Sequence, residues 1–96
     1  MKNSLENAVM KESEILEDMV LVLLYMFSWR EKVAPNLFVV RSWKGYSFDV
    51  LDALEESGYV SSSHGAKSVR ITDEGLERAG KLKEKMLAAL ASMSEN

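Results

Sequence analysis

Hydrophobic positions recur at three- and four-residue intervals through the first part of the chain, which predicts a helix over residues 3–29. A break near Lys11 is the alternative. One face of this helix is formed by Leu5, Val9, Leu16, Met19, Val20, Leu23 and Phe27. Between residues 19 and 27 the helix is apolar on every side, and such a helix is normally surrounded by protein. We therefore expect this part to be either the central core helix or part of a dimer interface.

The stretch that follows carries weaker signals and leads into a second helix. A Pro-Asn pair marks a turn, and residues 37–40 form a β-branched and aromatic run that is typical of a brief strand. The second helix is expected over residues 47–57, because Ser47 is a good N-cap and Gly58 a natural stop. Its spacing predicts three core-facing residues, namely Phe48, Leu51 and Leu54.

The rest of the sequence predicts a hairpin and a final helix. Strand-like residues 59–62 and 68–71 are joined by a polar link that carries Gly65 for the turn. Thr72 then caps a helix over residues 72–93. The apolar stripe of this helix is longer than a small core needs, so we expect part of it to pack on a second copy of the chain. The expected dimer interface residues are Leu82, Met86, Leu90 and Met93.

This order of elements predicts a fold of the α+β class that is mostly helical. A helix, a short strand, a helix, a two-stranded hairpin and a long C-terminal helix follow one another as they do in a winged helix. The 96 residues form one domain, because chains split into separate cores only at two or three times this length. The last helix, residues 72–93, is the expected dimerisation element within that domain.

Four short motifs lie between residues 43 and 75. They are Trp43-Lys44-Gly45-Tyr46, the run from Phe48 to Leu54, Gly58-Tyr59-Val60 and the run from Lys67 to Gly75. In these motifs the chain resembles an uncharacterised family of short bacterial proteins, a domain of unknown function. The last motif is also similar to the wing of many bacterial winged-helix regulators, where a strand runs into Leu/Ile-Thr-x-x-Gly and a dimerising helix. The resemblance implies a winged-helix-like fold and, for the family itself, no established function.

Composition and charge exclude several classes of protein. Hydrophobic residues make up 47% and charged residues 28% of the chain, which is ordinary for a folded domain. The net charge of −3 gives the whole chain no attraction for nucleic acid or anionic lipid. There is no cysteine, and the longest apolar run is far shorter than the roughly 20 residues that cross a membrane. We expect a cytoplasmic protein without a membrane partner.

Acidic residues on the second helix argue against DNA reading. In a DNA-binding winged helix this helix would enter the major groove. Its exposed face is expected to carry Asp49, Asp52, Ala53, Glu55 and Glu56, so four carboxylates would meet the phosphates. The stretch before it is also too short and too strand-like for the other helix of a helix-turn-helix. The alternative interpretation of these acids is a solvated helix face.

Basic residues on either side of that helix keep the DNA hypothesis open. Arg41 and Lys44 precede the helix, and Lys67 and Arg70 lie in the hairpin. From these positions all four side chains would contact a phosphate backbone without reading its sequence. Arg30 and Lys32 lie further upstream. The alternative is that these cations are solvated or pair with the acidic helix.

Three residues form a candidate protein-binding cluster. Arg41, Trp43 and Tyr46 lie close together in sequence, and these residue types dominate interface energetics. The alternative is that both rings close the core between the second helix and the hairpin.

Catalysis and metal binding find little support in the sequence. The single histidine, His64, lies among serines in a polar turn, and one histidine without cysteine cannot build a tetrahedral zinc site. We expect no catalytic residue, no cofactor and no metal. The expected function is a non-enzymatic dimeric protein-interaction module with an unknown protein partner. The alternative is a small winged-helix transcriptional regulator that contacts the DNA backbone through its hairpin and the basic loop before the acidic helix.

Overall fold

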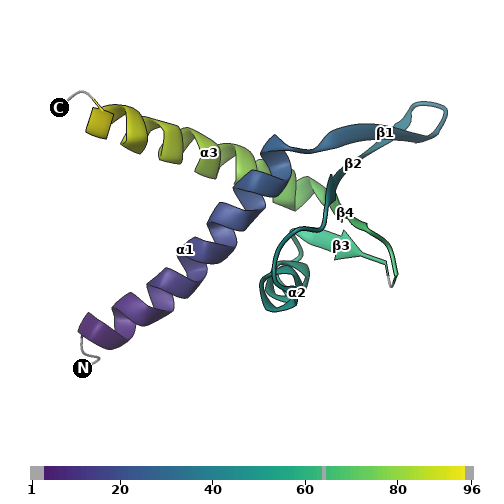
Figure 1. Ribbon diagram of the computed structural model, residues 1–96. Helices are drawn as coiled ribbons and strands as arrows, with labels where there is room; N and C mark the ends of the chain where they lie inside the picture. The colour runs from purple at the N-terminus through teal and green to yellow at the C-terminus, as the bar shows by residue number, and fades with distance from the viewer. Residues whose placement is uncertain (1–3, 64, 95–96) are drawn as a thin grey trace.

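The computed structural model of the protein describes residues 4–63 and 65–94, which form an α+β fold that is mostly helical. The described elements are α1 (Ser4–Met26), β1 (Trp29–Ala34), β2 (Leu37–Trp43), α2 (Phe48–Glu56), β3 (Val60–Ser62), β4 (Ser68–Ile71) and α3 (Asp73–Ser94). Figure 1 shows the strands together on one side of the molecule and the ends of α1 and α3 extending to the other. The predicted second helix, the β3–β4 hairpin and the long C-terminal helix are confirmed.

The strands form an antiparallel sheet in the order β1-β2-β4-β3, so β1 and β3 are its edge strands. Residues that pair across antiparallel strands share a face of the sheet. Ile71 lies opposite both Val40 and Val60, and these three residues face the core. The opposite face of the sheet, which we call the outer face, carries Arg41 between its partners Trp29 on β1 and Arg70 on β4.

The hydrophobic core forms where the three helices meet the inner face of the sheet. Leu21 is fully buried at 0% exposure, and Leu51 and Leu54 of α2 are buried as the sequence predicts. The residues of the core cluster are Val20, Leu21, Leu24, Leu51, Leu54, Val60, Val69, Ile71 and Ala79. Within the apolar segment 19–27, Val22 is also buried and Tyr25 packs against the core, whereas the side chains of Met19, Leu23, Met26 and Phe27 are exposed.

The first helix differs from the prediction at its C-terminal end. It runs without a break past Lys11 but ends at Met26, three residues before the predicted end, and Trp29 already belongs to β1. The side chain of Ser28 donates a hydrogen bond to the carbonyl oxygen of Tyr25 at 2.6 Å, which closes the last turn. The described chain between α1 and α2 therefore forms a β1–β2 hairpin and contains no helix. Its turn contains Asn36 at a φ of 64°, a left-handed conformation that asparagine tolerates.

The start of α3 is fixed by side-chain and backbone contacts with the segment before β3. The Thr72 hydroxyl donates a hydrogen bond to the Gly58 carbonyl at 2.6 Å and accepts one from the Gly75 amide at 3.0 Å. Gly75 is buried and lies so close to the carbonyl group of Tyr59 that a Cβ atom at this position would collide with it. The first turn of α3 therefore lies directly against the backbone at the entrance of β3.

The helices α1 and α3 cross beside the sheet and then diverge, so that they form a V (Figure 1). Arg78 of α3 donates a hydrogen bond to the Asp18 carboxylate of α1 at 2.9 Å near the crossing. This hydrogen bond raises the pKa of the Arg78 guanidinium. The Arg78 guanidinium also lies 5.2 Å from the centre of the Tyr59 ring. These contacts hold the two helices at their crossing and leave the arms of the V apart.

Candidate interaction surfaces

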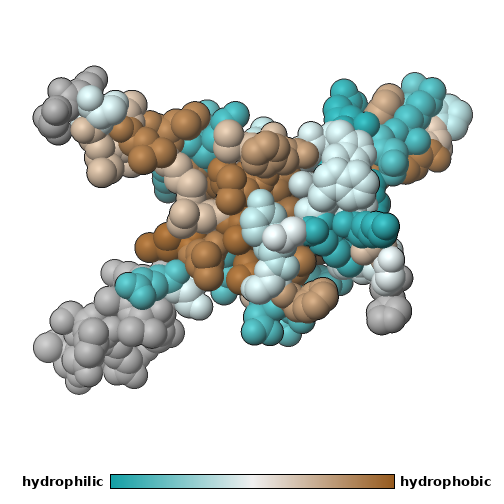
Figure 2. Space-filling view, in the orientation of Figure 1, coloured by the Kyte–Doolittle hydropathy of each residue, from teal (hydrophilic) through white to brown (hydrophobic). Residues whose placement is uncertain are grey.

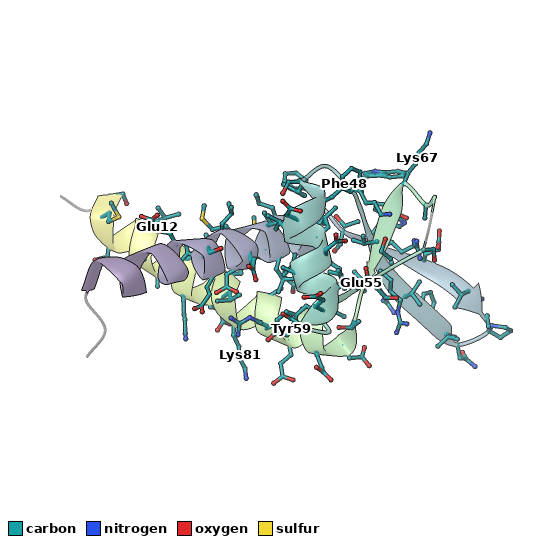
Figure 3. All side chains as sticks on the ribbon, turned by 90° about the horizontal axis from the view of Figure 1, so that it is seen from below. Glu12, Phe48, Glu55, Tyr59, Lys67 and Lys81 are labelled. Carbon is teal, nitrogen blue, oxygen red and sulfur yellow. The ribbon has the colours of Figure 1, made fainter. Side chains whose placement is uncertain are left out.

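A groove of about 880 Å³ lies between α2 and the residues that join β3 to β4. One wall is the face of α2 that carries Phe48, Leu51, Asp52 and Glu55, which recur at helical spacing. Figure 3 shows Phe48 and Glu55 at opposite ends of α2, with Lys67 near the Phe48 end. The residues that line the groove are Trp43, Lys44, Tyr46, Phe48, Leu51, Asp52, Glu55, Ser62, Ser63, Gly65, Ala66 and Lys67. We call this site the aromatic groove.

Three aromatic side chains line the groove, and two of them are largely exposed. Phe48 is 79% exposed and Trp43 is 62% exposed, whereas Tyr46 is half-buried against the core. The prediction that Phe48 faces the core is wrong. Phe48 shares a helical face with Leu51, but it is the first residue of α2 and its side chain lies at the groove instead. The interpretation that the aromatic rings before α2 close the core is therefore correct for Tyr46, which packs against the core, and wrong for Trp43, which is exposed.

Within the predicted protein-binding cluster, Arg41 shares the outer face of β2 with Trp43, two residues away, but lies outside the aromatic groove. Trp43 and Tyr46 both line the aromatic groove, whereas Arg41 does not. Its Nε atom donates a hydrogen bond to the Ser68 hydroxyl at 2.9 Å and lies 3.9 Å from the Glu31 carboxylate. Trp43 also contacts Trp29, with ring centres 4.8 Å apart. The sequence analysis assigned Trp29 to the first helix and therefore missed this aromatic pair.

The exposed face of α2 is acidic, as the sequence predicts. Asp49, Asp52, Glu55 and Glu56 are exposed, while Ala53 is half-buried. Among the described side chains, those of residues 12–63 and 65–94, none of these four carboxylates forms a salt bridge. Ser47 caps the helix by accepting a hydrogen bond from the Val50 amide at 3.4 Å. The helix therefore presents four carboxylates whose charge is not compensated by a described ion pair.

The four candidate DNA-backbone residues form two neighbouring pairs that lie on different surfaces. Arg41 lies directly opposite Arg70 on the outer face of the sheet. The backbone amide of Lys44 donates to the carbonyl oxygen of Lys67 at 2.9 Å just beyond the ends of β2 and β4, and these two lysines line the aromatic groove instead. Arg41 pairs with Glu31, and in the described part of the chain no member of the group pairs with an α2 carboxylate. The fold thus makes neighbours of Lys44 and Lys67, which are 23 residues apart in sequence, and of Arg41 and Arg70, which are 29 residues apart.

Arg30 and Lys32, the other cations named by the sequence analysis, lie on the β1–β2 hairpin and are exposed. The Arg30 guanidinium lies 4.5 Å from the centre of the Phe38 ring, on the inner side of the sheet. Because Arg41 and Arg70 occupy the outer face, Arg30 does not extend their cationic surface.

Exposed apolar side chains follow both arms of the V. Leu90 is 61% and Met93 is 71% exposed, so these two predicted interface residues lie free on the surface of α3. Leu82 and Met86 are half-buried, and Leu82 packs against the core of its own chain. Figure 2 shows hydrophobic surface on both arms of the V. We call this surface the helical stripe, and its members are Ile15, Leu16, Met19, Leu23, Met26, Leu87, Leu90 and Met93.

No group of three or more histidine, cysteine or carboxylate side chains is placed to hold a metal ion in the part of the chain that the structure describes. Among the same residues, none of the helices is both long enough and apolar enough to cross a membrane. His64, the one candidate for acid–base chemistry, lies outside the described residues.

Comparison with known proteins gives one match. A family model described as a domain of unknown function, DUF6429, matches residues 12–89. No curated protein and no solved structure matches the chain. The matched range contains the whole sheet, α2, the aromatic groove and most of both arms of the V.

Proposed function

Since the chain belongs to the DUF6429 family, whose function is unknown, we propose a function from the structure: a non-enzymatic protein-interaction module that works as a homodimer. The helical stripe supports the dimer, and the aromatic groove supports the binding of a further protein. We also propose that the fold is a variant of the bacterial winged helix. In this variant α2 stands in place of the recognition helix, the β3–β4 hairpin forms the wing, and the β1–β2 hairpin replaces the missing helix.

The observation that carries the proposal is the exposure of the helical stripe. Soluble monomers rarely leave a large contiguous apolar surface in water. Five large apolar residues of α1 and three of α3 are each between 37% and 71% exposed. Burying an apolar side chain of this size is worth about 1.5–3 kcal/mol, so association of two copies gains far more than scattered surface residues would offer.

Charge also favours a second copy of the same chain as the occupant of the V. The α1 arm carries Glu12, Glu14, Glu17 and Asp18. The facing part of α3 carries Arg78, Lys81, Lys83 and Lys85, with Glu84 as the one acid among residues 78–85. In a two-fold dimer, α1 of each copy packs on α3 of the other, so each acidic arm meets a basic one. The Asp18–Arg78 hydrogen bond shows the same pairing within one chain.

Leu90→Glu combined with Met93→Glu is expected to convert the dimer to a monomer. Both side chains are more than half exposed, so the substitution leaves the core intact but places two carboxylates in the interface. The molar mass measured by size-exclusion chromatography with light scattering should fall from that of two chains to that of one. Circular dichroism checks that the variant keeps its helical content.

Ala88→Glu combined with Ser92→Glu is the matched control. These two exposed residues lie on the side of α3 opposite Leu90 and introduce the same charge. We expect this variant to remain a dimer. A wild-type protein that is monomeric at all concentrations, or an equal response of the two variants, would contradict the proposed interface.

A small DNA-binding regulator is the second candidate function, because Arg41 pairs with Arg70 across β2 and β4 and Lys44 neighbours Lys67 at the ends of the same strands. The acidic face of α2 opposes this function, since α2 would have to approach the phosphates. We expect no binding to random-sequence duplex DNA at low salt, measured by fluorescence anisotropy. Salt-dependent binding that is lost on Lys67→Ala with Arg70→Ala would establish the regulator instead. Lys81→Ala with Lys85→Ala removes the same charge from α3 and serves as the control.

A further inference from the structure

The aromatic groove has the properties of a binding site for a segment of another protein. Phe48 and Trp43 are the two most exposed aromatic side chains beside it, and Leu51 forms part of its lining. Large aromatic residues that cluster around a depression are the residues from which most interface free energy comes. A groove of this size admits one large apolar side chain together with the residues on either side of it.

Small described residues line much of the side of the groove opposite α2, beside Lys44 and Lys67. They are Ser62, Ser63, Gly65 and Ala66, and none of them has a side chain longer than two heavy atoms. A bound segment can therefore lie with its backbone close to these residues while its apolar side chain contacts Phe48 and Trp43. The hydroxyl groups of Ser62 and Ser63 can act as hydrogen-bond donors and acceptors, whereas the Ser63 carbonyl already accepts a hydrogen bond from the Ala66 amide.

The charges around the groove determine the chemistry of the segment. Asp52 and Glu55 line the groove, Asp49 and Glu56 flank them on α2, and none of the four pairs with a cation in the described part of the chain. The two lysines of the groove lining, Lys44 and Lys67, belong to the opposite side, and Figure 3 places Lys67 toward the Phe48 end of α2 and away from Glu55. The field along α2 therefore attracts cations most strongly toward the Glu55 end.

We propose that the aromatic groove binds a segment of a partner protein in which a large apolar residue is followed by arginine or lysine. The apolar side chain occupies the Phe48 and Trp43 end, and the cations lie along α2 toward Glu55. This inference rests on the proposed interaction function and names the chemistry of its partner. The groove is lined only by residues between Trp43 and Lys67, so it does not share residues with the helical stripe.

Selection of random peptides displayed on phage tests the proposal, with the wild-type protein immobilised as bait. The selected peptides should be enriched in an aromatic or large aliphatic residue beside arginine or lysine. A labelled peptide from the selection should bind about tenfold more weakly to Phe48→Ser, because that variant removes the most exposed anchor contact. Binding to Asp52→Asn with Glu55→Gln should also weaken and should depend less steeply on salt.

Two further variants serve as controls. Glu84→Gln removes an exposed carboxylate from α3, outside the groove, and should bind the peptide as the wild type does. Leu90→Glu with Met93→Glu should also keep peptide binding, so loss of the dimer and loss of the groove are observed separately. Selection of acidic peptides, the absence of enrichment over the bare support, or equal binding to wild type and Phe48→Ser would each overturn the proposal.

Discussion

Replacing Gly75 by alanine is expected to lower the free energy of unfolding by about 3 kcal/mol, the upper end of what overpacking usually costs. The new methyl group would collide with the carbonyl group of Tyr59 and would also meet the side chain of Ile71. The obstacle on the Tyr59 side is backbone, so it cannot move aside as a flexible side chain would. Either α3 shifts along its length or the entrance of β3 moves, and both changes disturb the core.

Gly80→Ala is the matched control for this prediction. Gly80 lies in the same helix, and a Cβ atom there would meet nothing within 4 Å. Alanine should stabilise the helix at this position by about 0.5–1 kcal/mol. Thermal unfolding followed by circular dichroism separates the two variants, since a domain of this size changes its Tm by about 4–8 °C per kcal/mol. Equal melting temperatures would show that α3 does not depend on close contact with Tyr59.

Leu21→Ala is expected to cost about 3 kcal/mol, a typical value for truncation of a fully buried leucine. Leu21 has no exposed surface, and it lies where α1 meets α2 and the sheet. Removing its isobutyl group leaves a cavity that neighbouring elements cannot fill without moving. Urea unfolding of the Leu90→Glu, Met93→Glu monomer measures this cost without a contribution from dimer dissociation.

Leu23→Ala provides the comparison in the same helix. Leu23 is 37% exposed and belongs to the helical stripe, so in the monomer its truncation should cost less than about 1 kcal/mol. The two variants are expected to rank in the opposite order when dimerisation is measured by light scattering. There Leu23→Ala weakens association directly, whereas Leu21→Ala acts only by lowering the stability of each chain. If both substitutions lowered the free energy of unfolding of the monomer equally, the face of α1 that carries Leu21 would not be the buried one.

The elements with strong local signals were predictable from the sequence, and those defined by distant contacts were not. Ser47 and Thr72 cap α2 and α3 through local hydrogen bonds, and Gly58 ends α2 with a positive φ. β1 was missed because Trp29 was assigned to the first helix and half of the six residues Trp29 to Ala34 are charged, which gives no strand pattern. Only pairing with β2 makes them a strand, and that pairing depends on the turn at Asn36.

The candidate surfaces were likewise predictable where local spacing defines them and not where distant contacts do. The acidic face of α2 follows from helical spacing and was predicted correctly. The position of Phe48 was not, because spacing gives the face of a helix but not where the neighbouring elements end. The position of Arg41 was predicted only in part. Arg41 and Trp43 share the outer face of the sheet, but the Arg41 guanidinium binds the Ser68 hydroxyl, and only Trp43 and Tyr46 line the groove.

The two edge strands restrict how copies of this protein can associate. An open strand edge invites another chain to add to the sheet, and such addition repeats without limit and ends in aggregation. β1 carries Arg30, Glu31 and Lys32 at consecutive exposed positions, and β3 has only three residues, so both edges resist this growth. In the proposed two-fold dimer, by contrast, contact through the helical stripe would be complete when two copies have met. Such a dimer would combine a large exposed apolar surface on each chain with an assembly of finite size.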